Sequence, residues 1–184
     1  MFLNHETSTF SVRRISDNCC FCDRAKIKQA LNLGLLMLIG VCFAGYARAV
    51  PLVWDLDTGD AAIVTDGSGN WQVGQPNWND AGADVSWTDG SDAVFGGGTL
   101  GSSGVVTLGS AISAESLTFN TPNGGGTYTI DTSTFALTLN SGITANESAS
   151  IQSGVGGSII LGAANSWDVA DTKELTVDAI ISGT

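Results

Sequence analysis

Residues 128–151 read YTIDTSTFALTLNSGITANESASI, and this stretch decides the fold. It holds three short runs of alternating character, Tyr128-Thr129-Ile130, Leu137-Thr138-Leu139 and Ala149-Ser150-Ile151. Successive side chains of a strand point to opposite faces, so the outer residues of each run share one face and the hydroxyl residue lies on the other. Polar turn residues separate the runs, and no helix-period pattern follows Val50. The stretch therefore predicts short strands with one buried face and one outward face.

Similar runs recur throughout residues 99–184. Further examples are Leu117-Thr118-Phe119, Ile159-Ile160-Leu161, Trp167-Asp168-Val169, Leu175-Thr176-Val177 and Ala179-Ile180-Ile181. They alternate as two sets with a period of about 20 residues, which is typical of a β-solenoid whose coils bury their inner faces against one another. A β-sandwich is the alternative, because its strands also recur at short intervals. We predict an all-β solenoid over residues 99–184, incomplete at its C-terminus.

Residues 50–98 are rich in tryptophan and acidic side chains. Trp54, Trp71, Trp78 and Trp87 are spread through this region, and Asp-Gly turn signals stand between them. Large aromatic side chains at wide spacing suit a small β-layer that closes the end of a fold, because each ring covers a large apolar area. We therefore expect an N-terminal β cap over residues 50–98.

Residues 1–49 have the composition of an export leader. They contain six of the seven Lys and Arg residues, all four cysteines and the single histidine, His5. A basic segment precedes an uncharged apolar stretch, and Ala47-Arg48-Ala49 offers the small-x-small pattern that precedes signal-peptidase cleavage, here expected after Ala49. An uncleaved signal anchor is the alternative, since about 18 apolar residues can span a bilayer. Either way, residue 50 onward is exported.

The composition of the exported part excludes most catalytic chemistry. Residues 50–184 carry fifteen acidic side chains against one base, Lys173, which gives a formal charge of −14. They lack His, Cys and Arg, so we expect no Ser-His-Asp or Cys-His nucleophile and no His or Cys ligands for zinc or copper. The charge also opposes nucleic acids and, after leader cleavage, anionic membranes. We expect no enzyme, no catalytic residue and no cofactor; a carboxylate-based polysaccharide hydrolase or lyase is the remaining catalytic alternative.

Two sets of residues are weak candidates for binding. Asp55, Asp57 and Asp60 lie within six residues of sequence, and hard oxygen ligands in a loop suit calcium. The competing interpretation is that these aspartates cap their own turns. Exposed rings of Trp71, Trp78 and Trp87 could stack on glycans, which makes a secreted carbohydrate-binding module the second functional hypothesis; the competing interpretation places these rings in the core.

The Trp and Gly landmarks resemble a known family. The stretches Trp54-Asp55, Asp66–Trp71, Asn77-Trp78 and Asp92–Gly97 resemble the start of proteins with autotransporter-associated β-strand repeats. The resemblance implies a right-handed parallel β-helix in an exported protein, secreted or at the cell surface, and outer-membrane associated where an anchor is present. It also implies a structural or adhesive role and partners among surface glycans or other surface proteins. On this basis we expect the chain to be the N-terminal part of a longer protein, with open strands near Leu175–Ile181 that favour self-association.

Overall fold

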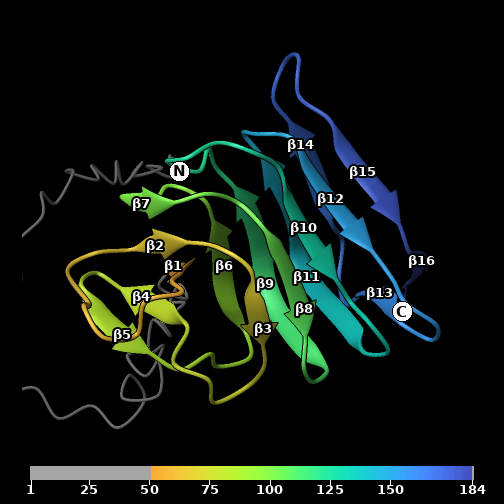
Figure 1. Cartoon of the computed structure of the whole chain (residues 1–184). Helices are drawn as coiled ribbons and strands as arrows, with labels where there is room; N and C mark the ends of the chain where they lie inside the picture. Colours follow the sequence, from red (N-terminus) through yellow and green to blue (C-terminus); the bar gives the residue numbers. More distant parts are fainter. Residues whose placement is uncertain (1–50, 184) are drawn as a thin grey trace, which may run out of the picture. The chain divides into compact units, whose positions relative to one another are not determined.

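The computed structural model describes residues 51–183, which fold into strands and turns without a helix (Figure 1). None of these residues therefore forms a helix long and apolar enough to cross a membrane. The predicted cleavage residues Ala47 and Ala49 lie outside the described residues. The strands are, in chain order, β1 (Pro51–Trp54), β2 (Thr65–Asp66), β3 (Gly69–Trp71), β4 (Trp78–Asp80), β5 (Ala83–Val85), β6 (Ser91–Phe95), β7 (Leu100–Gly101), β8 (Val105–Leu108), β9 (Ile112–Phe119), β10 (Tyr128–Asp131), β11 (Ala136–Ala145), β12 (Ala149–Gln152), β13 (Ser158–Leu161), β14 (Ser166–Val169), β15 (Leu175–Asp178) and β16 (Ile180–Gly183).

Parallel ladders stack these strands into a solenoid. The larger sheet has the order β16-β13-β11-β9-β6-β1-β4-β5, with β14 also paired to β11, and the second sheet has the order β15-β12-β10-β8-β3. The chain thus returns to each sheet once per coil and lies beside the strand of the previous coil, as Figure 1 shows. Among the described strands, antiparallel pairing is confined to β1–β4 and β4–β5. The predicted all-β solenoid is confirmed, and the antiparallel sheets of a β-sandwich are excluded.

One coil takes slightly more residues than the sequence predicted. Val106, Ile130, Ile151 and Val177 are in register in successive strands of the second sheet, at steps of 24, 21 and 26 residues. The extra residues belong to a third strand segment in each coil, because β11 bends between Leu139 and Gly142 and pairs on both sides of the bend.

Because of this bend, the repeated runs stack in a different order from the predicted one. Leu117–Phe119 pairs with Ile143–Ala145 rather than with Leu137–Leu139. Likewise, Leu175–Val177 pairs with Ala149–Ile151. The sequence indicated two alternating sets of runs, but each coil contributes three. The run Ile143–Ala145 was not predicted, because Gly142 interrupts the apolar alternation before it. Gly142 is required there, since a Cβ atom would collide with the carbonyl oxygen of Ser166 in the next coil.

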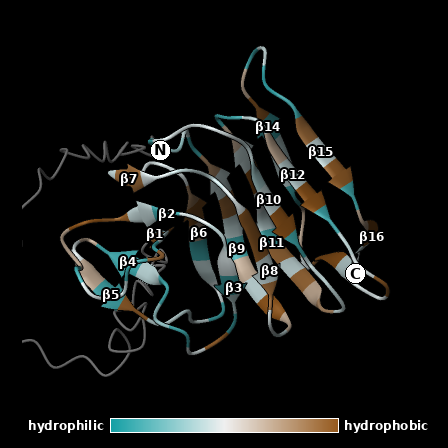
Figure 2. Cartoon of the chain, viewed as in Figure 1, coloured by the Kyte–Doolittle hydropathy of each residue, from teal (hydrophilic) through white to brown (hydrophobic). Residues whose placement is uncertain are grey.

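A single apolar core runs through the solenoid. Along strands such as β10, β12 and β15, apolar and polar residues alternate (Figure 2). The inward side chains come from the Trp-rich region as well as from the repeats, since β3 pairs with β8 and β6 with β9. The solenoid therefore begins at β1. The buried core residues are Leu52, Trp54, Trp71, Trp78, Trp87, Ala93, Phe95, Val106, Leu108, Ile112, Ala114, Leu117, Phe119, Tyr128, Ile130, Leu137, Leu139, Ile143, Ala145, Ala149, Ile151 and Ile159.

The two ends of the solenoid differ: the β1 end carries a hairpin, and the other end is an exposed strand. At the β1 end, the β4–β5 hairpin turns through Ala81 and Gly82, both at positive φ (48° and 94°), as a two-residue hairpin loop requires. At the other end, β16 is exposed along its whole length, and Ile180 and Ile181 retain 69% and 46% of their accessible surface.

Candidate functional site

The tryptophans proposed for glycan stacking lie in the core. Trp71, Trp78 and Trp87 expose 0%, 0% and 1% of their surface, and their ring centroids lie 4.7 to 5.2 Å apart. Trp54 packs edge-on against Trp78 at 5.3 Å. A buried ring offers no face to a sugar, so the glycan-stacking interpretation of these three residues is corrected. Their large apolar areas close the β1 end of the core instead.

The three aspartates proposed for calcium each cap a turn. Asp55 Oδ1 accepts hydrogen bonds from the backbone N–H groups of Asp57 and Thr65, both at 3.0 Å. Asp57 Oδ1 accepts from Gly59 N at 3.0 Å, and Asp60 Oδ1 from Ala62 N at 3.2 Å. Asp57 and Asp60 are exposed, whereas Asp55 is buried. Within residues 51–183 no three His, Cys, Asp or Glu side chains converge as metal ligands, so the predicted trio is not brought together.

The outward faces of the sheets carry hydroxyl groups in register. In the second sheet, Val105, Thr129, Ser150 and Thr176 occupy one row across β8, β10, β12 and β15. Neighbouring strands lie about 4.8 Å apart, so the row presents side chains at a regular spacing. Val105 and Thr176 are exposed, and Thr129 and Ser150 are half-buried.

A second row of this kind crosses the larger sheet. Val94, Thr118, Thr144 and Asp168 are in register on β6, β9, β11 and β14. Thr144 belongs to the run Ile143–Ala145, which follows Gly142 and has no clear strand pattern in the sequence, so this row could not be aligned from the sequence.

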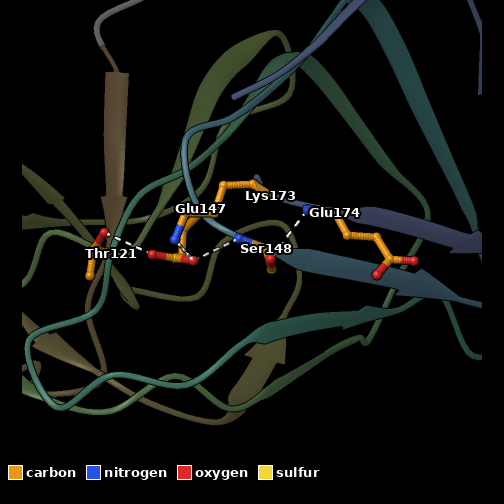
Figure 3. Close-up of polar contacts among 5 residues, drawn as sticks. All are labelled: Thr121, Glu147, Ser148, Lys173 and Glu174. Carbon is orange, nitrogen blue, oxygen red and sulfur yellow. Dashed lines mark hydrogen bonds and ion pairs between the residues drawn. The ribbon is translucent and has the colours of Figure 1, made fainter. Parts of the chain in front are cut away.

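The single base of residues 50–184, Lys173, is held in an ion pair at a corner of the solenoid (Figure 3). Lys173 Nζ lies 2.6 Å from Glu147 Oε1, and Thr121 donates its hydroxyl to Glu147 Oε2 at 3.1 Å. The hydrogen bond from Lys173 is the main cause that lowers the pKa of Glu147 below its ordinary value of 4.5; the N–H of Ser148 adds to it. These contacts join three successive coils, and the rest of the surface formed by residues 51–183 carries no base.

Comparison with known proteins connects this geometry to a class of surface protein. The chain is 35% identical, over 119 aligned residues, to the adhesin BmaC autotransporter of Brucella suis biovar 1 (strain 1330). The chain resembles an autotransporter passenger. This confirms the resemblance seen in the Trp and Gly landmarks. The alignment covers 59% of this chain, and the chain spans 3% of the adhesin's length. No family model matches the chain, and no solved structure matches it significantly.

Proposed function

We propose that residues 51–183 belong to an exported, adhesive surface protein of the autotransporter passenger type, and that they act without catalysis. The observation that carries this proposal is the similarity to an autotransporter adhesin in a chain that folds as a parallel β-solenoid. A solenoid suits adhesion because stacked coils build extended, regular surfaces.

The outward hydroxyl rows support the adhesive part of the proposal. Thr129, Ser150 and Thr176 can donate or accept hydrogen bonds to a partner at a spacing set by the ladder. Surface glycans and polar surface proteins are the partners that such rows suit. Export to the cell surface or the medium accords with the leader-like composition of residues 1–49.

A non-catalytic role is supported by the side chains available. Residues 50–184 contain no His, Cys or Arg, and Lys173 is engaged by Glu147. Three of the acidic side chains that could act as general acids or bases instead cap turns, because each accepts a hydrogen bond from a nearby backbone N–H group. They are Asp55, Asp57 and Asp60.

Self-association is a further part of the proposed interaction behaviour. β16 and β15 are the last strands of their sheets, and Ile180 and Ile181 are exposed on β16. An apolar strand with unpaired backbone groups favours pairing with another strand.

The adhesive proposal is tested with the purified chain coupled to beads. We expect the beads to bind epithelial cells or a glycan array more strongly than beads that carry an unrelated acidic protein. Ser150→Arg and Thr144→Arg each place a bulky group at the centre of one outward row, and at least one of them should reduce binding several-fold. Circular dichroism checks that both variants keep the fold. Binding equal to that of the unrelated protein, or unaffected by both variants, contradicts the proposal.

A further inference from the structure

A cluster of covered polar side chains lies on the outer face of the β1–β4–β5 ladder. Trp54, Trp78 and Val85 are in register across the three strands on the core side. Asn79 and Asp84 form the adjacent row and, because strand side chains alternate, lie on the opposite side. Asp55, which follows Trp54, shares that side.

The loop of residues 56–64 covers this face. Leu56 N donates to Thr65 O at 2.9 Å and closes the loop at its base. Asn79 Nδ2 donates to Ala61 O at 2.8 Å and fixes the middle of the loop over the ladder. As a result Asp55 is completely buried, Asn79 is 3% exposed and Asp84 is half-buried.

Two carboxylate oxygens in this covered region have no hydrogen-bond partner among residues 51–183. They are Asp55 Oδ2 and Asp84 Oδ1. Burial is the main cause that raises the pKa of Asp55, and the neighbouring Asp84 carboxylate raises it further. The N–H groups of Thr65 and Asp57 and the Asn79 amide oppose this rise. Asn79 Nδ2 donates one of its two N–H groups to Ala61 O, and its other N–H lies close enough to lower the pKa of Asp55 without completing a hydrogen bond to Oδ2.

Residues 51–183 offer no free cation to neutralise this pair. Lys173 is the single base after residue 50, and it lies against Glu147. Two neighbouring carboxylates in a covered site are costly unless a positive partner is supplied. Unpartnered carboxylate oxygens are hard ligands, which suit calcium because calcium tolerates irregular geometry and completes its shell with carbonyls and water.

We propose that Asp55 and Asp84 bind a calcium ion beneath the 56–64 loop. The pair replaces the trio Asp55, Asp57 and Asp60 that the sequence suggested, because Asp57 and Asp60 use an oxygen each to cap exposed turns. This site goes beyond the adhesive function and does not depend on it. With two carboxylates, the expected affinity is in the millimolar range typical of extracellular modules.

The test uses thermal unfolding of the full chain. In 10 mM calcium, against chelator at matched ionic strength, the melting temperature of the wild type should rise by about 4 °C. Asp84→Asn should lose the rise, because it removes one ligand charge while keeping the shape. Asp60→Asn is the matched control, since Asp60 caps an exposed turn of the same loop, and it should keep the rise.

A second readout covers the case in which Asp84→Asn unfolds. Terbium, a luminescent substitute for calcium, should be sensitised by Trp54 and Trp78, the neighbours of this site in the ladder. Calcium should displace it, and Asp60→Asn should give the wild-type signal. Equal rises with sodium or magnesium at matched ionic strength indicate charge screening and overturn the proposal. So does a calcium effect that survives in a folded Asp84→Asn.

Discussion

The hydroxyl group of Tyr128 donates a hydrogen bond to Asp66 Oδ1 at 2.9 Å, although 62 positions separate the two residues in the sequence. Both side chains are buried, and the N–H of Gly67 donates to the same hydroxyl at 3.1 Å. Asp66 Oδ2 also accepts from Asn123 N at 3.3 Å. This network joins the coil that contains β2 to the coil that contains β10. It lies at a corner where the backbone ladder between β2 and β7 is only two residues long.

Tyr128→Phe should destabilise the fold by about 2–3 kcal/mol, because it leaves Asp66 Oδ1 and the N–H of Gly67 without their partner in a buried place. Urea unfolding followed by tryptophan fluorescence measures the change. Thr129→Val, next to it on the outward face, is the control and should shift stability far less. A loss below about 0.5 kcal/mol for Tyr128→Phe would show that water replaces the hydroxyl.

The same tyrosine makes the fold sensitive to alkali. Burial is the main cause that raises the pKa of Tyr128 above its ordinary value of 10.0, and the charge of Asp66 adds to it. The unfolded chain therefore releases this proton above pH 10 while the folded chain retains it, so stability is full below pH 10 and is lost as the pH rises further. We expect the urea midpoint to fall from pH 10 to pH 11 in the wild type, and to fall less in Tyr128→Phe. Equal slopes in the two proteins would contradict this account.

Lys173→Gln should lower the melting temperature at pH 7 and low salt, because it removes the partner that lowers the pKa of Glu147. The contribution of a lowered carboxyl pKa is present above the unfolded value of 4.5 and is lost as the pH falls through the folded value. The gap between wild type and variant should therefore narrow below pH 4.5, and also at high salt, because both groups are partly exposed. Differential scanning calorimetry across pH tests this; a gap independent of pH and salt would point to lost packing of the lysine stem.

Trp78→Ala should cost about 3–5 kcal/mol, as expected for removing a large buried aromatic side chain. Its ring contacts Trp54, Trp71, Trp87 and Phe95. Near-ultraviolet circular dichroism should lose the exciton-like signal of the cluster, and urea unfolding gives the energy. Val73→Ala, at a residue 51% exposed, is the control and should change stability by less than about 0.5 kcal/mol.

Thr172→Asn should stabilise the protein by about 0.5–1 kcal/mol. Thr172 has φ of 69°, a left-handed conformation that is strained for a β-branched residue and tolerated by asparagine. The measurement is the urea midpoint. Thr176→Asn provides the comparison, because Thr176 lies in β15 and exchanging a strand-favouring residue for asparagine should be destabilising. A lower midpoint for Thr172→Asn would mean that the turn at 170–173 depends on the threonine side chain.

The fold class could be predicted because alternation is a local property of the sequence. Each run, such as Tyr128–Ile130, shows its buried and outward faces without knowledge of its neighbours. Which runs stack on which could not be predicted, because that depends on the bend between Leu139 and Gly142. Only the ladder reveals that Leu117 lies beside Ile143.

The candidate binding residues also depend on long-range pairing that the sequence does not reveal. Sequence spacing grouped Asp55 with Asp57 and Asp60, yet the unpartnered carboxylate oxygen near Asp55 belongs to Asp84, 29 positions along the chain. That proximity arises from two antiparallel pairings, β1 with β4 and β4 with β5, and spacing alone cannot encode it. For the tryptophans, the sequence left core and surface both open. Their burial decided for the core: Trp54, Trp71 and Trp78 pack against Phe95, and Trp87 packs against two of these rings.

The tryptophan cluster stabilises the β1 end of the solenoid. Each coil of a solenoid contacts only its neighbours, so separation starts at an end and travels coil by coil. Four buried indole rings hold the β1 end, whereas Trp167, Leu175 and Val177 near the other end are only partly covered. When residues 51–183 are unfolded on their own, coils should therefore separate from β16 towards β1, and the coils that contain the tryptophans should separate last.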